Sequence, residues 1–157
     1  MSQPQKPGPS AKVTLREITA ETVGPVCRLS RTLPEHQHGF VADNAFSIAQ
    51  AHFSETAWFR AVYADETPVG FIMLDDDATK PEYFLWRFMI GGDYQGNGYG
   101  RKAIELLVDY VKTRPGAKEL LVSFVQKEHG PEEFYLKTGF KLNGQMHGGE
   151  VGATLEL

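Results

Sequence analysis

The alternation of hydrophobic and polar residues divides this chain into short strands and amphipathic helices. Runs rich in apolar, β-branched and aromatic residues predict seven strands, at residues 13–18, 58–64, 69–74, 83–90, 120–125, 140–145 and 151–157. Apolar residues at helical spacing predict four helices, at residues 21–30, 44–53, 100–112 and 131–137. In the second of these, Asn44 is the expected N-cap, and Phe46, Ala49 and Phe53 fall on one face that we expect to be buried. The order β-α-α-β-β-β-α-β-α-β-β indicates an α/β protein.

Length and composition predict one globular domain. The 157 residues suffice for one core and are short for two. We expect a domain at residues 12–157, after a disordered lead-in at residues 1–11 that is rich in Pro, Gln and Ser. The net charge of −4, without a dense Lys/Arg cluster, argues against nucleic acid or an anionic membrane as a partner. The single cysteine fits a reducing compartment, and no segment has the length of a membrane span, so we expect a cytoplasmic protein.

A glycine-rich segment after the predicted strand 83–90 carries the clearest chemical signal. Glycines stand at positions 96, 98 and 100, between this strand and the helix predicted at 100–112. Such a strand–loop–helix unit directs backbone N–H groups and the positive end of the helix dipole at one point, which favours an anion such as phosphate. Arg101 and Lys102 add positive charge in the first turn. The alternative is a simple glycine-rich turn between a strand and a helix.

The segment Gln95-Gly96-Asn97-Gly98-Tyr99-Gly100 resembles the Q/R-x-x-G-x-G/A motif of the GCN5-related N-acetyltransferase (GNAT) superfamily, which grips the pyrophosphate of acetyl-CoA. The element order matches the family's from about residue 13 onward. The resemblance implies a mixed central sheet of about seven strands flanked by four helices. It also implies acetyl-CoA as co-substrate, with no metal. The cofactor-binding residues it implies are Phe88, Met89, Ile90, Gln95, Gly96, Asn97, Gly98, Tyr99, Gly100, Arg101, Lys102, Phe134 and Lys137.

A second match follows in Phe134-Tyr135-Leu136-Lys137-Thr138-Gly139-Phe140, which is similar to the family's F/L-Y-x-K-x-G-F segment. The resemblance implies that Tyr135 is the general acid that protonates the CoA thiolate, and a phenol suits this role. The alternative is a core tyrosine with a satisfied hydroxyl. The segment departs from the family's pattern at Glu128 and Pro131, where the family often has Asn and Ala.

The general base is not identified by the motifs. Some polyamine acetyltransferases of the family carry a glutamate midway along the central strand, where this chain has Trp86. Glu82 lies on the same side of the predicted strand and is the nearest acidic substitute. A water chain, or a solvated role for Glu82, stays open.

Acidic residues on loops that flank the predicted cleft suggest a cationic acceptor. Weaker resemblance to a bacterial diamine and spermidine branch points the same way, although acidic loops are usually solvated surface. The residues we expect to bind substrate are Glu35, Asp43, Asp75 and Trp86.

We therefore predict an acetyl-CoA-dependent N-acetyltransferase that acts on a diamine or polyamine by direct transfer, since no activated nucleophile is visible. Another amine acceptor (an aminoglycoside, an amino acid or a protein N-terminus) and a non-catalytic acetyl-CoA sensor are the alternatives. The sequence is compatible with a homodimer but does not indicate which surface would form it.

Overall fold

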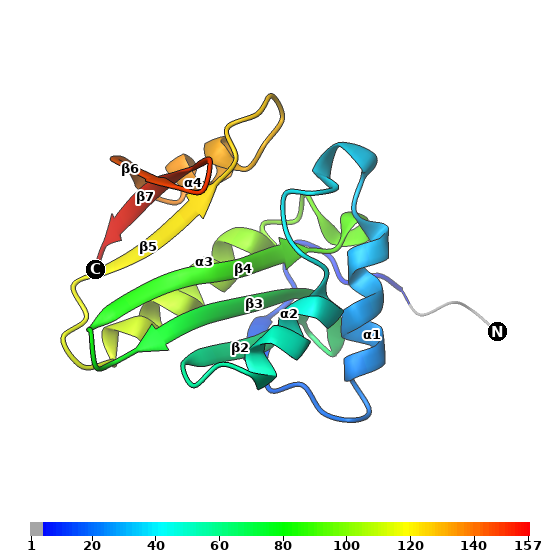
Figure 1. Ribbon diagram of the computed structural model, residues 1–157. Helices are drawn as coiled ribbons and strands as arrows, with labels where there is room; N and C mark the ends of the chain where they lie inside the picture. Colours follow the sequence, from blue (N-terminus) through cyan, green and yellow to red (C-terminus); the bar gives the residue numbers. More distant parts are fainter. Residues whose placement is uncertain (1–4) are drawn as a thin grey trace.

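Seven strands form one mixed sheet in the computed structural model, which describes residues 5–157 (Figure 1). The strands follow the spatial order β1-β2-β3-β4-β5-β7-β6, and only the β4–β5 pair is parallel. Their bounds are β1 Val13–Arg16, β2 Ala57–Ala64, β3 Thr67–Asp77, β4 Glu82–Ile90, β5 Glu119–Phe124, β6 Lys141–His147 and β7 Glu150–Glu156. The predicted α/β fold and element order are confirmed.

Helices cover both faces of this sheet and enclose two hydrophobic clusters. On one face lie α1 (Val23–Arg28) and α2 (Asn44–His52), and on the other lie α3 (Tyr99–Lys112) and α4 (Glu132–Lys137). Three short 3₁₀ helices, Leu29–Thr32, Glu35–Gln37 and Gly92–Tyr94, connect these elements. The α3 face carries the larger cluster, which includes Ile104, Leu107 and Val111 from the helix. Within residues 5–157, no helix has both the length and the apolar character needed to cross a membrane.

The central strands β4 and β5 separate along their length. They pair only through Phe84 with Leu121 and Leu85 with Val122, and beyond these residues no ladder joins them. On its other edge, β4 stays paired with β3, with a bulge that leaves Trp86 unmatched between Leu85 and Arg87. The edge of β4 from Phe88 to Ile90 therefore faces β5 without a strand partner.

The predicted buried face of the second helix is wrong. Phe46 is 58% exposed and Phe53 is 88% exposed, and Ala49 is exposed as well. The helix instead buries its narrower face, formed by Asn44, Ser47 and Ala51. The amide of Asn44 makes this possible, because it donates to the Val26 carbonyl at 2.9 Å. Asp43, rather than Asn44, occupies the N-cap position.

The acidic segment 75–77 is the end of β3 and not the loop that the sequence suggests. Asp75, Asp76 and Asp77 pair with Phe84, Tyr83 and Glu82 of β4. Local partners hold each of these carboxylates: Thr56 for Asp75, Tyr110 and Arg114 for Asp76, and Thr79 for Asp77.

The part of the predicted lead-in that the structure describes lies against the start of α3. The Tyr99 hydroxyl donates to the Gly8 carbonyl at 2.7 Å, and Ala11 is buried. Residues 1–4 of the lead-in lie outside the described residues.

Candidate active site

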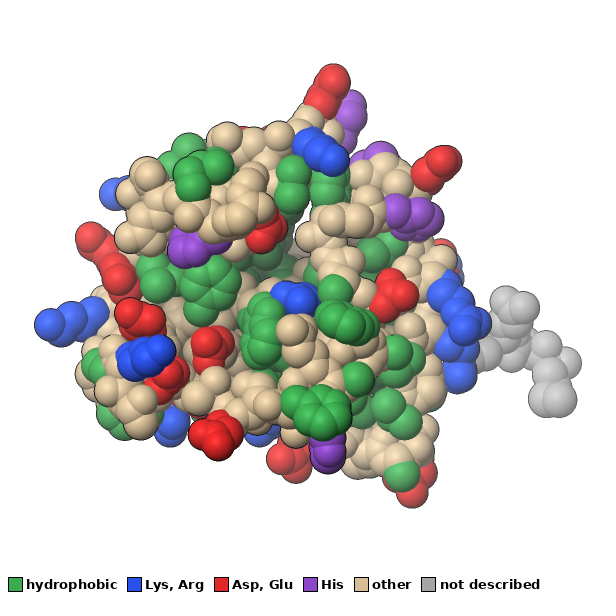
Figure 2. All heavy atoms as spheres, in the orientation of Figure 1, with side chains coloured by type: hydrophobic (Ala, Val, Ile, Leu, Met, Phe, Trp, Pro, Cys, Tyr) green, Lys and Arg blue, Asp and Glu red, His purple; other side chains and the backbone are tan. Residues whose placement is uncertain are grey.

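The separation of β4 and β5 opens a cleft of about 950 Å³ through the middle of the molecule. Figure 2 shows the surface hollowed between the C-terminal strands and the rest of the protein, with hydrophobic side chains inside. The cleft is lined by β4, the glycine-rich loop, the start of α3, the end of β5, α4, the loop before α2, and the turn between β6 and β7. Segments from both halves of the chain therefore meet around one opening.

The glycine-rich loop presents an uncapped helix N-terminus to one end of the cleft. Gly98 is the N-cap of α3 and has a left-handed conformation, with φ of 81°. No side chain caps the helix, so its first N–H groups are free to bind an anion. A residue with a Cβ would be strained at this φ, which explains the glycine.

Gly100 allows the start of α3 to pack closely against Phe134. A Cβ at this position would lie 3.1 Å from the Phe134 ring. The rings of Phe134 and Phe88 stack with centroids 5.8 Å apart, and both line the cleft. The missing side chain thus lets the first turn of α3 meet an aromatic wall built from β4 and α4.

Most of the cofactor-binding residues implied by the resemblance line this cleft. Two do not. The Asn97 amide donates to the Tyr94 carbonyl at 3.0 Å and so fixes the loop. The Lys102 ammonium donates to the Pro9 carbonyl at 3.0 Å, away from the cleft. The residues that do line it are Phe88, Met89, Ile90, Gln95, Gly96, Gly98, Tyr99, Gly100, Arg101, Phe134 and Lys137.

Gln95 ties the glycine-rich loop to the segment before α2. Its amide nitrogen donates to the Ile90 carbonyl at 2.9 Å and to the Gln37 side chain at 2.8 Å. The Gln37 amide donates back to Gln95 at 2.9 Å. The motif glutamine therefore shapes the loop and joins the two segments that border the cleft.

Tyr135 of α4 lies in the wall of the cleft, against the end of β5. Its ring stacks on Phe124 of β5 at 5.3 Å and makes edge contacts with Phe134 and Phe140. Within residues 5–157, no group hydrogen-bonds to its hydroxyl, although the residue is only 7% exposed. Burial, with a smaller contribution from the negative charge of Glu150, raises the pKa of Tyr135 well above its ordinary value. The phenol is therefore protonated at neutral pH.

Glu150 and Arg87 place a carboxylate and a guanidinium at the other end of the cleft. The sequence does not predict either of them as a site residue. Glu150 begins β7 and accepts a hydrogen bond from Ser123 of β5 at 3.2 Å. Arg87 follows the β4 bulge and donates to Gln50 of α2 at 3.1 Å. Burial lowers the pKa of Arg87, and the charge of Glu150 partly opposes this. We call the end of the cleft around Glu150, Ser123 and Arg87 the acceptor end, after the role that we propose for it below.

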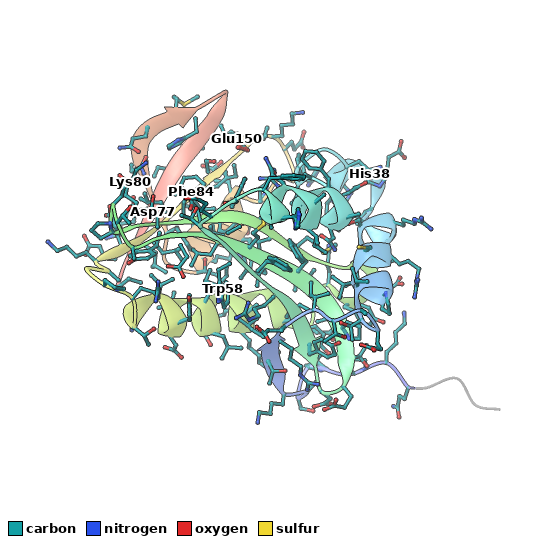
Figure 3. All side chains as sticks on the ribbon, turned by 60° about the horizontal axis from the view of Figure 1, so that its bottom comes forward. His38, Trp58, Asp77, Lys80, Phe84 and Glu150 are labelled. Atoms are coloured by element: carbon teal, nitrogen blue, oxygen red, sulfur yellow. The ribbon has the colours of Figure 1, made fainter. Side chains whose placement is uncertain are left out.

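The sequence carries only a weak signal for Glu150. It follows two glycines in a turn, where a carboxylate is ordinarily solvated surface. Figure 3 labels Glu150, which lies on the C-terminal hairpin, and Phe84, which lies on β4. The ring of Phe84 contacts His147 of the same hairpin at 5.6 Å, so the hairpin reaches across the opening between the strands.

The acidic residues predicted to act on the substrate lie elsewhere. Glu82 is exposed at the start of β4, and it does not line the cleft. Neither do Glu35, Asp43 or Asp75, whereas Trp86 does. Figure 3 shows Asp77 and Lys80 at the end of the sheet opposite His38, which marks where the acidic end of β3 lies. The structure thus brings Trp86 and Tyr135 together with Glu150, and leaves the other predicted carboxylates outside.

Comparison with known proteins gives one consistent family. The sequence profile of the "Acetyltransferase (GNAT) family" matches residues 26–140. The spermine/spermidine N(1)-acetyltransferase of Bacillus subtilis strain 168 is 28% identical over 91 residues, which are 54% of this chain and 60% of that protein. A probable spermine N(1)-acetyltransferase from Bacillus subtilis subsp. natto matches to the same extent. The matched region thus spans less than two thirds of these relatives' length.

Solved structures share the fold at low sequence identity. An acetyltransferase from Thermus thermophilus has a TM-score of 0.75 and 15% identity, over 93% of this chain and 97% of that one. The PaiA N-acetyltransferase of Thermoplasma acidophilum, solved in complex with coenzyme A, has a TM-score of 0.72 and 17% identity, over 93% and 99% of the two chains.

Proposed function

Because the chain belongs to the acetyltransferase (GNAT) family, we propose that it transfers the acetyl group of acetyl-CoA to a primary amine bound in the same cleft. One observation carries the proposal. The opening between β4 and β5 holds the uncapped N-terminus of α3 at one end, a carboxylate at the other, and the Tyr135 hydroxyl in its wall.

The residues at the glycine-rich loop suit the pyrophosphate and pantetheine of acetyl-CoA. The free N–H groups of the first turn of α3 would bind phosphate oxygens, and Arg101 and Lys137 at the cleft add positive charge. The unpaired edge of β4 from Phe88 to Ile90 offers backbone groups to the amides of pantetheine, as a neighbouring strand would. The Phe88–Phe134 wall would contact its apolar parts.

The acceptor must lose a proton before it attacks, because an alkylammonium has no free electron pair. We propose Glu150, directly or through Ser123 or water, as the group that takes this proton, in place of the predicted Glu82. The amine nitrogen then bonds to the acetyl carbon and gives up its second proton to water, and the bond from that carbon to sulfur breaks. Tyr135 gives its proton to the departing thiolate and recovers one from solvent. The phenol is available as a proton donor because a tyrosine is protonated at neutral pH.

The polyamines spermine and spermidine are the acceptors that the names of the Bacillus relatives suggest. Glu150 supplies one carboxylate for an ammonium group. A row of carboxylates along the cleft is not part of the proposal, since the predicted acidic residues lie outside it. A homodimer and a cytoplasmic location stay predictions.

A thiol-release assay tests the proposal. Purified protein is given acetyl-CoA with spermidine, spermine, putrescine, simple alkylamines, amino acids, aminoglycosides or N-terminal peptides, and acetylated products are identified by mass spectrometry. We expect saturable release that depends on an amine. If the protein bound acetyl-CoA but no amine accelerated thiol release, a non-catalytic acetyl-CoA sensor would replace the enzyme as the proposed function.

A further inference from the structure

Arg87 differs from every other partly buried arginine in the described chain. Arg16, Arg60 and Arg114 each lie within ion-pair distance of a carboxylate, at 2.8, 3.8 and 2.9 Å. Within residues 5–157, no carboxylate lies within 4.0 Å of Arg87. A partly buried guanidinium without a counter-charge is unfavourable, so the missing partner calls for an explanation.

Neutral groups hold the Arg87 guanidinium in place without cancelling its charge. One terminal nitrogen donates to the Trp86 carbonyl at 3.1 Å, and the other donates to the Gln50 side chain at 3.1 Å. The buried Nε atom has no partner within the described residues. Two of the five N–H groups of a guanidinium are therefore used, and the side chain lines the cleft.

Arg87 lies at the end of the cleft where we propose that the acceptor binds. It follows the bulge of β4, at the point where β4 leaves β5, and α2 contacts it from the face opposite α3. Glu150 and Arg87 both line the cleft, yet within residues 5–157 the two do not form an ion pair. The acceptor end thus offers an anion and a cation to a ligand in the cleft.

On the premise that the proposed acetyl transfer is correct, we infer that the natural acceptor is an amino-carboxylate, with its amine at Glu150 and its carboxylate at Arg87. The planar guanidinium fork matches a carboxylate, and the pair gains strength where water is scarce. A second ammonium group, as in a diamine, would instead meet a fixed positive charge and be repelled. Gln50 is a positioning residue in this arrangement, because it orients the guanidinium.

Acceptors of equal length that differ only at the far end test this inference. The probes are 5-aminopentanoate, n-pentylamine and 1,5-diaminopentane, with 3-aminopropanoate, n-propylamine and 1,3-diaminopropane as a shorter series. We expect kcat/KM for the best amino-carboxylate to exceed that of its alkylamine and its diamine by about tenfold or more. Highest kcat/KM for the diamines in both series would overturn the inference while leaving the acetyltransferase proposal intact. Turnover of another amine in the thiol-release panel, with none of these probes, would also overturn the inference. No turnover of any amine would instead mean that the proposed function itself fails.

Substitution of Arg87 supplies the second arm. Arg87→Gln should lower kcat/KM for the amino-carboxylate and raise it for the diamine of the same length. Opposite signs cannot arise from damaged folding, which would lower both. Arg87→Lys keeps the charge and should retain part of the preference. Arg60→Gln removes a partly buried arginine outside the cleft and is the matched control. It should not change the ratio of kcat/KM for the amino-carboxylate to kcat/KM for the diamine. An unchanged ratio in Arg87→Gln would contradict the inference.

Discussion

The two ends of the cleft are built in different ways. At the cofactor end, one continuous stretch from Phe88 to Arg101 supplies the strand edge, the loop and the helix N-terminus. At the acceptor end, Gln50, Arg87, Ser123 and Glu150 come from four separate elements. The first end is a local structure with a fixed sequence pattern, and the second exists only once the sheet has formed.

Under the proposed function, the two ends depend on different parts of the chain. Backbone N–H groups would bind the anion at the cofactor end, so the loop needs glycine conformations more than particular side chains. The acceptor end depends on the side chains of Arg87 and Glu150, and a single substitution changes its charge. We therefore expect variants at the two ends to act on different substrates.

The largest effect is expected at Tyr135, which serves both ends. Tyr135→Phe should lower kcat about 10²-fold or more and leave the KM for acetyl-CoA unchanged, because the ring packing stays and only the acid is lost. Steady-state kinetics with a saturating amine measure this. Tyr83→Phe is the control, since Tyr83 is also buried and donates to the Pro115 carbonyl outside the cleft. An unchanged kcat in Tyr135→Phe would remove this residue from the chemistry.

Substitution of Glu150 and of Glu82 distinguishes the general base proposed from the structure from the one predicted from the sequence. Glu150→Gln should lower kcat/KM for the amine by about 10- to 100-fold, with partial recovery as the pH rises and more free amine is present. Glu82→Gln should change it less than about twofold, because its side chain is exposed outside the cleft. The reverse ranking would restore Glu82 as the base and contradict the assignment of Glu150 to the acceptor end.

The conformation of Gly98 gives the corresponding test at the cofactor end. Gly98→Ala should raise the acetyl-CoA KM about tenfold and leave the amine KM unchanged, because a left-handed residue with a Cβ distorts the loop. Gly144→Ala is closely matched: its φ is 78° against 81° at Gly98, and a Cβ at either site meets nothing within 4 Å. If Gly144→Ala raised the acetyl-CoA KM equally, the effect would be general strain.

Asp76 tests whether the acidic end of β3 takes part in amine binding. Asp76→Asn should cost about 1–2 kcal/mol of unfolding free energy, because Tyr110 and Arg114 lose a charged partner. Urea denaturation measures this, and the KM for the amine should not change. A clear rise in that KM would return the acidic segment to the substrate site.

The smallest effect concerns pH. Burial, followed by the hydrogen bond to Asp76, raises the pKa of Tyr110 to about 12. The folded state therefore disfavours the tyrosinate, so this stabilising contribution is complete below about pH 10 and is lost as the pH rises toward 12. Tyr110→Phe should make the fall in stability over this range shallower than in the wild type. Equal slopes would show that the tyrosine does not contribute.

The sequence predicts the fold and the strand–loop–helix unit well because both depend on local patterns. The strand, glycine loop and α3 lie where the periodicity and the motif place them. The face of α2 is predicted wrongly because Asn44, a polar residue, is buried through a hydrogen bond to Val26, which lies on another helix. Arg87 and Glu150 are missed for a similar reason. Their placement in one cleft depends on the bulge in β4 and on the hairpin of β6 and β7 reaching the opening, and neither is a property of nearby residues.

The proposed transfer requires acetyl-CoA and the amine to occupy the two ends of one cleft at the same time. Initial rates of thiol release, measured while acetyl-CoA and an amine are varied together, test it most directly. Simultaneous occupancy predicts intersecting lines in a double-reciprocal plot, and no burst of thiol when the amine is left out. Parallel lines, with a stoichiometric burst of thiol before any amine is added, would show transfer through an acetylated enzyme and contradict the claim.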